Sequence, residues 1–383
     1  MIFTGSSVLV GVAVDPATMI AARALQGVGS AIVAPTSLAL LTATFEEGRE
    51  RTRAVALYAA VAGIGASVGL VVGGAAVELV SWRAGFLLNV PMGAVMLALA
   101  VRYIRELPRT PGRFDLLGAV TSTLGMGALI FGIVNSGLEG WGAPATLTGL
   151  GAGVLLLAVF VINEWRVPQP IMPLRLFASP VRTGSLLVRL LFMGAFIGFF
   201  YFTTQYFQTV LGWSPLQAGF GFLPMTVVNF AVAMVVTQIA GRVGTFTTLA
   251  LGVGSTFAGM AWLSFLTADS SFLFGVALPM ALIGAGQGLA LAPMTGYGLH
   301  GVTGADAGAA SGLINTAQQL GLSLGLAALV ALGANASAGA TDEITRTMDV
   351  VSAGLTGAAG LLAMALVVTF AVVLPGAVRV RDR

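Results

Sequence analysis

The chain has 383 residues, of which 57% are hydrophobic and 9% are charged, and its mean hydropathy is +0.95. Soluble domains carry about 25% charged residues, so this composition excludes a water-soluble fold and indicates a membrane protein. The net charge is +3, with no cysteine and one histidine, which excludes disulfides and thiolate chemistry, and no acidic or histidine cluster has metal-ligand spacing. We therefore expect no enzyme, no metal and no cofactor, and the scattered arginines give no sign of nucleic-acid binding.

Apolar runs divide the chain into segments of about twenty residues, the length that a helix needs to cross a hydrocarbon core of about 30 Å. Barrel strands would appear as alternating segments of about ten residues. The runs therefore predict an all-α polytopic transmembrane bundle of twelve helices, at residues 1–14, 17–44, 51–79, 84–103, 116–137, 145–164, 184–210, 216–240, 246–267, 272–296, 307–334 and 351–375. The first run is short and has no signal-peptide features, so we expect a helix whose beginning is missing.

The second run contains a charged residue. Arg23 lies about six residues into the run, roughly 9 Å at 1.5 Å per residue. A charge at that depth costs at least a few kcal/mol unless it is paired or hydrated, so Arg23 is a candidate functional residue. Gln26 follows one turn later. The alternatives are that Arg23 snorkels to the interface or bonds to backbone carbonyls in a structural role.

The third run contains glycines at every fourth residue. Gly65, Gly69 and Gly73 fall on one helix face, and Gly74 follows directly. Small residues in this pattern let two helices cross closely in a membrane. Packing is the interpretation that we favour for them.

Two later runs carry amides and aromatic residues that could line a cavity. Buried amides need hydrogen-bond partners, so a solute cavity is one explanation for them, and interhelical hydrogen bonds or interfacial aromatics are the other. The cavity candidates are Phe199, Phe202, Gln205, Tyr206 and Gln208 in one run, and Asn315 and Gln319 in another. Two polar residues between runs, His300 and Asp306, are expected to be solvated.

The arginines indicate how the chain is oriented, because basic loops are retained in the cytoplasm. Fifteen of them fall on one side of the twelve-helix arrangement, and Arg83 and Arg346 fall on the other. The first group predicts a multi-pass protein of the cell membrane with a cytoplasmic C-terminus. It consists of Arg49, Arg51, Arg53, Arg102, Arg105, Arg109, Arg113, Arg166, Arg175, Arg182, Arg189, Arg242, Arg379, Arg381 and Arg383.

Several stretches resemble a known family. Residues 23–31 resemble the R-x-x-Q-G-x-G-x-[AS] motif on the fourth helix of major facilitator drug antiporters, here on the second run. Residues 65–74 resemble the family's G-x3-G-P-x2-G-G motif, with Leu70 at the proline position. Residues 206–219 and 308–321 are similar to further segments of the fourteen-helix drug:proton antiporters. We therefore expect twelve of fourteen helices to be present, with two missing before Met1.

The resemblance implies a major facilitator fold and an export function. It predicts an incomplete N-terminal bundle over 1–103, two extra central helices and a linker over 104–182, and a six-helix bundle over 183–383. It also implies proton-coupled export of hydrophobic or cationic small molecules by a monomer in the bilayer, with Arg23 and Gln26 in proton coupling. The family's first-helix acid and second-loop motif are absent from this sequence. The alternatives are thus a truncated membrane protein without coupled transport, or an exporter of a specific lipid or natural product.

Overall fold

The computed structural model describes residues 1–45, 49–104, 115–302, 306–336 and 342–375. Helices occupy all twelve predicted positions, and the described residues contain no strand. Nine of the described helices are long and apolar enough to cross a membrane. The predicted all-α transmembrane fold is therefore confirmed.

The chain divides into two compact units, and the first comprises residues 1–111 and 213–223. Glycine residues let its helices pack closely: a Cβ added to Gly29 would lie 2.5 Å from the backbone nitrogen of Phe3, which places the two backbones in direct contact. Its helices are α1 (Ile2–Gly11), α2 (Pro16–Thr44), α3 (Arg49–Leu79), α4 (Trp82–Leu87), α5 (Asn89–Tyr103) and the short α9 (Pro215–Gly221).

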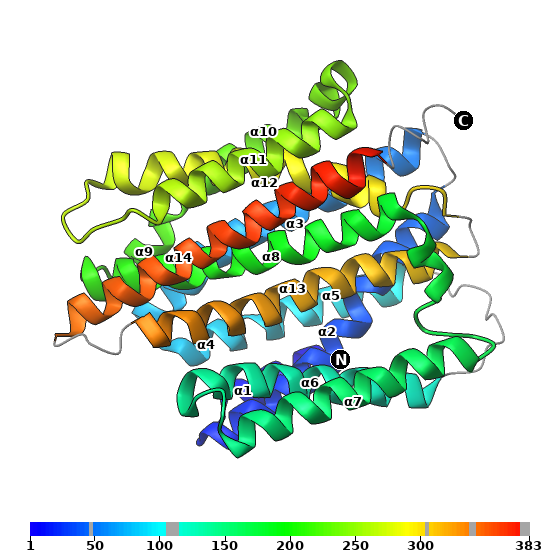
Figure 1. Cartoon of the computed structure of the whole chain (residues 1–383), viewed down its shortest axis with the longest axis horizontal. Coiled ribbons are helices and arrows are strands. Elements are labelled where there is room, and N and C mark those ends of the chain that lie inside the picture. Colours follow the sequence, from blue (N-terminus) through cyan, green and yellow to red (C-terminus); the bar gives the residue numbers. More distant parts are fainter. Residues whose placement is uncertain (46–48, 105–114, 303–305, 337–341, 376–383) are drawn as a thin grey trace. The chain divides into compact units, whose positions relative to one another are not determined.

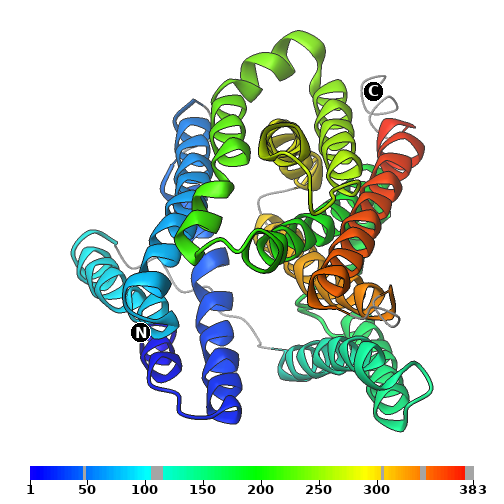
Figure 2. The same cartoon turned by 90° about the vertical axis from the view of Figure 1, so that its left-hand side faces the viewer.

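The second unit comprises residues 112–212 and 224–383. It contains α6 (Leu116–Glu139), α7 (Pro144–Arg166), α8 (Pro180–Gln205), α10 (Leu223–Val243), α11 (Thr245–Leu263), α12 (Leu278–Gly298), α13 (Ala307–Ala336) and α14 (Glu343–Val368). Helices α13 and α14 both pack against α8, as Figure 1 shows. Helices α6 and α7 form an antiparallel hairpin that is visible from both directions (Figure 1, Figure 2). The predicted boundaries at 104 and 182 stay predictions.

Helices α11 and α12 of the second unit pack closely against each other, and glycines make this possible. A Cβ on Gly286 would lie 2.5 Å from both the Gly252 carbonyl oxygen and the Thr256 backbone nitrogen. A Cβ on Gly259 would lie 2.6 Å from the Pro279 carbonyl oxygen. Because the hydrophobic effect does not drive helices together in lipid, such close van der Waals packing is a main source of association.

The starts of several helices follow local rules. Asp15 precedes α2, and its carboxylate accepts a hydrogen bond from the Thr18 backbone nitrogen at 2.8 Å. Asp115 caps α6 in the same way through Gly118, at 2.9 Å. Proline follows the cap at Pro16, where its missing N–H costs nothing. These caps determine the first residue of each helix, which hydropathy alone leaves uncertain by several residues.

One arginine contradicts its predicted position between helices. Arg182 and Arg189 both lie inside α8. Arg182 is buried, with 6% of its surface exposed, and Arg189 is half-buried. The assignment of Arg182 to a connecting loop is wrong, because α8 begins at Pro180, four residues before the predicted run 184–210. Arg189 lies inside α8 and inside that run.

Candidate functional site

The first unit holds a polar network on α1 and α2. Arg23 donates a hydrogen bond to Gln26 Oε1 at 2.7 Å, and Gln26 Nε2 donates to Ser7 Oγ at 2.7 Å. Gln26 is 4% exposed and Ser7 is fully buried. The Arg23 guanidinium carbon also lies 5.4 Å from the centre of the Phe86 ring, within the range of a cation–π contact. The two predicted coupling residues are thus in direct contact.

The two glycines of this motif differ in their packing. Gly29 lies against Phe3 of α1, whereas a Cβ on Gly27 would meet nothing within 4 Å among the described residues. Arg83 of α4 donates to the Ala13 carbonyl oxygen at 3.1 Å. This bond ties α4 to the turn between α1 and α2, beside the network.

The predicted glycine series on α3 splits into two groups. A Cβ on Gly65, Gly69 or Gly73 would meet nothing within 4 Å among the described residues, so their close crossing stays a prediction. A Cβ on Gly74 would lie 2.7 Å from the Pro215 carbonyl oxygen of α9. Gly74 therefore permits close contact between α3 and α9.

A carboxylate strengthens the contact between α3 and α9. Glu78 Oε2 accepts hydrogen bonds from Ser214 Oγ at 2.5 Å and from the Leu216 backbone nitrogen at 3.0 Å. Ser214 and Gln217 form a capping box at the start of α9. Glu78 thus adds a negative charge at a helix N-terminus, where the helix dipole favours it.

The aromatic cavity candidates on α8 lie in the packed interior of the second unit. Phe199, Phe202 and Tyr206 are fully buried. Phe202 packs against Gly354 of α14, where even a Cβ would overlap its ring, and the Tyr206 hydroxyl donates to the Thr267 carbonyl oxygen at 3.2 Å. Their contact with a solute stays a prediction.

The amide candidates differ in exposure. Gln205 is half-buried and Gln208 is exposed, near the end of α8 and its π-helical extension Tyr206–Val210. On α13, Asn315 is half-buried and Gln319 is exposed. Their predicted role in the substrate cavity is also untested.

Sequence reasoning missed a polar cluster in the second unit. Arg189 donates to Thr295 Oγ1 of α12 at 3.0 Å and to Gln318 Oε1 of α13 at 2.8 Å. The signal was present, because residue 189 falls inside the run 184–210. A charge inside an apolar run indicates function by the same argument that selected Arg23.

Another polar pair joins α10 and α12. Asn229 donates a short hydrogen bond to the side-chain oxygen of Gln287. Gln287 is 9% exposed and lies between Gly286 and Gly288. These glycines bring α12 close enough to its neighbours for the short amide side chains to meet.

Acidic and amide side chains meet where α6 begins and α7 ends. Asn163 donates to Asp115 Oδ2 at 2.7 Å, and Glu164 Oε2 accepts a bond from the Met172 backbone nitrogen at 2.6 Å. The Gly118 N–H bond is the main reason that the pKa of Asp115 lies below its ordinary value, and burial opposes it. Asp115 is thus held in its charged form at the start of α6.

The segment between α7 and α8 is anchored to the end of α12 and the start of α13. Arg182 donates to the Leu176 carbonyl oxygen at 2.8 Å and to the His300 carbonyl oxygen at 2.7 Å. Arg175 forms an ion pair with Asp306 at 2.5 Å. These bonds correct the expectation that Asp306 is simply solvated, since it has a charged partner.

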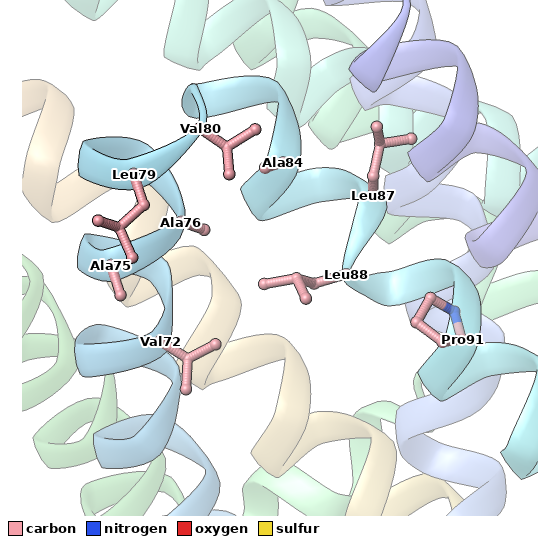
Figure 3. Close-up of a pocket in the computed structure, with 9 residues that line it drawn as sticks. All are labelled: Val72, Ala75, Ala76, Leu79, Val80, Ala84, Leu87, Leu88 and Pro91. Carbon is pink, nitrogen blue, oxygen red and sulfur yellow. The ribbon is translucent and has the colours of Figure 1, made fainter.

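An apolar pocket of about 470 Å³ lies in the first unit. Figure 3 shows Val72 and Leu79 of α3 on one side and Leu88 and Pro91 on the other. Its lining consists of Val72, Ala75, Ala76, Leu79, Val80, Ala84, Leu87, Leu88 and Pro91. Because these side chains are all aliphatic, the pocket has no group that could orient a polar solute.

Comparison with known proteins gives a consistent result. Residues 1–326 match the family model described as Major Facilitator Superfamily. The chain is 39% identical over 348 residues to the cephamycin export protein CmcT of Amycolatopsis lactamdurans, covering 90% of this chain and 72% of that protein. It is 36% identical to the puromycin resistance protein pur8 of Streptomyces alboniger, covering 87% and 67%.

Other relatives are longer than this chain. The multidrug resistance protein Stp of Mycobacterium tuberculosis is 33% identical, and the match covers 86% of this chain but 61% of that protein. Among solved structures, one of proton dependent oligopeptide transporters has a TM-score of 0.57 at 17% identity, covering 99% of this chain and 82% of that chain. At that identity the likeness concerns the fold.

Proposed function

Because this chain belongs to the Major Facilitator Superfamily, we propose that it is a secondary active transporter that exports small organic molecules across the cell membrane. The similar proteins are named for export of, or resistance to, antibiotics and multiple drugs. The chain carries polar groups inside apolar helices, as a carrier requires, and its described residues contain no group of acidic or histidine residues that could hold a metal. The exported solutes are hydrophobic or cationic drugs or natural products.

The observation that carries this proposal is the network of Arg23, Gln26 and Ser7. Its arginine sits seven residues after the first residue of α2, at a depth of about 10 Å. Among the described residues Arg23 has only neutral partners, Gln26 and the Phe86 ring. The Arg23 side chain is exposed in the structure, and a charge at that depth of an apolar helix needs a partner or hydration. An acid whose protonation follows the transport cycle would supply the partner. We therefore assign Arg23 to proton coupling, with Gln26 orienting its guanidinium.

The test is transport in proteoliposomes that contain only this chain. A fluorescent lipophilic cation such as ethidium is placed on one side, a pH difference is imposed, and dye and proton movements are recorded together. We expect the dye to move against its gradient as protons move in the opposite direction. Inserted protein that moves neither dye nor protons would contradict the proposal and support the alternative of a membrane protein without coupled transport.

The orientation is part of the same proposal. We infer a cytoplasmic C-terminus, because the arginines of the sequence are concentrated on one side of the helices. The monomer is proposed from the family resemblance alone. A reporter that folds only outside the cytoplasm, fused after Arg383, should stay silent. Strong reporter signal at that position would reverse the orientation.

A further inference from the structure

Arg189 places a second guanidinium inside a membrane-spanning helix. It lies nine residues after the first residue of α8, or about 13 Å along the helix axis. The segment Pro180–Val210 is one of the nine candidate membrane spans. A charged residue at such a depth is expensive and is a candidate functional residue for that reason.

The bonds of Arg189 use only part of its hydrogen-bonding capacity. A guanidinium has five N–H donors, and Arg189 gives one to Thr295 and one to Gln318. Its Nε is buried without a hydrogen-bond partner among the described residues. Thr295 is itself fixed, since its hydroxyl donates to the Leu291 carbonyl oxygen at 2.9 Å. The cluster thus holds the guanidinium in place and leaves donors on both terminal nitrogens.

The helices around Arg189 provide no counter-charge. Helix α8 packs against α12, α13 and α14, and the sequences of α8, α12 and α13 contain no aspartate or glutamate. Helix α14 has Glu343 and Asp349 in its first turns, but α14 is antiparallel to α8, with Gly354 beside Phe202 and Val372 beside Gly184. Those two carboxylates therefore lie toward the opposite end of α8 from Arg189.

We propose that Arg189, Thr295 and Gln318 form a subsite for the carboxylate of an exported solute. This inference rests on the proposed transport function and adds a chemical class to it. Guanidinium groups match carboxylates in charge and in planar, two-point geometry. The same unpaired charge repels a cationic group, so the subsite favours acids over the cationic solutes that family resemblance suggests.

The test compares two aromatic probes of nearly equal size, 1-naphthoate and its neutral amide, 1-naphthamide. The full chain is placed in nanodiscs of phosphatidylcholine, and binding is measured by calorimetry. We expect naphthoate to bind at least about tenfold tighter than naphthamide, as one charge-assisted hydrogen-bond pair provides. Equal affinities, or no naphthoate binding, overturn the proposal.

Variants identify the residue responsible. Arg189→Gln should remove the preference for naphthoate, and Arg189→Lys should keep only part of it because a lysine lacks the planar fork. Arg175→Gln is the matched control, since Arg175 belongs to the same unit but pairs with Asp306 outside the spans. An equal loss of preference in Arg175→Gln overturns the proposal.

Two further measurements separate the explanations. If Arg189→Gln does not fold, Thr295→Val with Gln318→Leu keeps the charge but releases the guanidinium, and should weaken naphthoate binding while naphthamide binding is unchanged.

Nanodiscs that contain phosphatidylglycerol test for a lipid headgroup, and full displacement of naphthoate there would overturn a solute site. Ethidium transport without naphthoate preference overturns only this inference, whereas naphthoate preference without any transport overturns only the proposed function.

Discussion

Helix α2 of the first unit and α12 of the second unit share a local design. Each has a buried glutamine beside glycines, Gln26 at 4% and Gln287 at 9% exposure. Each glutamine bonds to a polar side chain of a neighbouring helix, Ser7 of α1 and Asn229 of α10. Glycines bring the helices close, and the short amide then reaches across.

The two helices differ in where the positive charge lies. Arg23 is on α2 itself and donates to Gln26. No arginine lies on α12, and Arg189 reaches it from α8 to bond Thr295 instead, two turns beyond Gln287. The comparison teaches that the buried amide of one packing motif can either bond to an arginine on its own helix or have no charged partner. We connect the first arrangement with proton coupling and the second with solute binding.

The largest expected effect comes from removing the charge on α2. Arg23→Gln should abolish the dependence of transport on the pH difference while solute still binds, because an amide cannot compensate an acid. The rate of pH-driven transport should fall about tenfold or more, which is the effect of losing one charged hydrogen bond. Arg83→Gln is the control, since within the described part of the chain Arg83 donates to the Ala13 carbonyl oxygen and stacks on Trp82. Equal losses in both variants would make Arg23 a structural residue.

The next effect concerns the glycines that make the design possible on α12. Gly286→Ala should lower the free energy of unfolding by about 1–3 kcal/mol, because its Cβ meets backbone atoms of α11. Gly254→Ala is the control on α11, where a Cβ meets nothing within 4 Å among the described residues and alanine favours the helix. Thermal unfolding in detergent measures the stability of both variants and distinguishes Gly286→Ala from Gly254→Ala. A stabilised Gly286→Ala would show that α11 and α12 can separate without cost.

A smaller effect separates the two glutamines. Gln26→Leu and Gln287→Leu should each lower the free energy of unfolding by about 1 kcal/mol, as loss of one interhelical hydrogen bond does. Only Gln26→Leu should also weaken the pH dependence of transport, because only Gln26 holds an arginine. Parallel pH profiles for both variants would remove the distinction that we draw between α2 and α12.

The smallest effect lies at the starts of the two helices. Asp15 caps α2, and the Thr18 hydroxyl, with its backbone N–H, holds the pKa of Asp15 below its ordinary value of 3.8. The π-helical turn that leads into α12 is capped by the neutral Ser271. A lowered pKa means that the stabilisation is present above the ordinary value and is lost as pH falls through the folded-state pKa. Asp15→Asn should therefore flatten the slight loss of stability below about pH 4, while Ser271→Ala should leave that slope unchanged.

Sequence alone predicted the helices well, because crossing a bilayer demands long apolar runs that few other folds contain. It placed Gln26 one turn after Arg23, and the family resemblance gave both residues one role, but it did not predict the hydrogen bond between them. It did not predict Ser7, because a serine in an apolar run gives no sign of which distant residue it will meet. Ser7 and Gln26 are 19 residues apart and on different helices.

Arg189 shows a different limit. It stands near the beginning of its run, so it resembled the basic residues that flank helices. Its partners Thr295 and Gln318 are 106 and 129 residues away in the sequence. Contacts at that separation depend on how α8, α12 and α13 pack, which periodicity within one helix does not specify.

The chain has a single histidine, His300, and the hydrogen bond from Arg182 uses its main-chain carbonyl oxygen and not its imidazole ring. Arg182 recognises the carbonyl oxygens of Leu176 and His300, not their side chains. Every amino acid supplies such a carbonyl, so position 300 is free to vary during evolution while the bond is preserved. Arg182 itself has no such freedom, because the main chain offers it acceptors that only a long, forked donor can reach together. We therefore expect substitutions to be tolerated at position 300, which supplies only its carbonyl oxygen, and not at Arg182, which supplies the donor side chain.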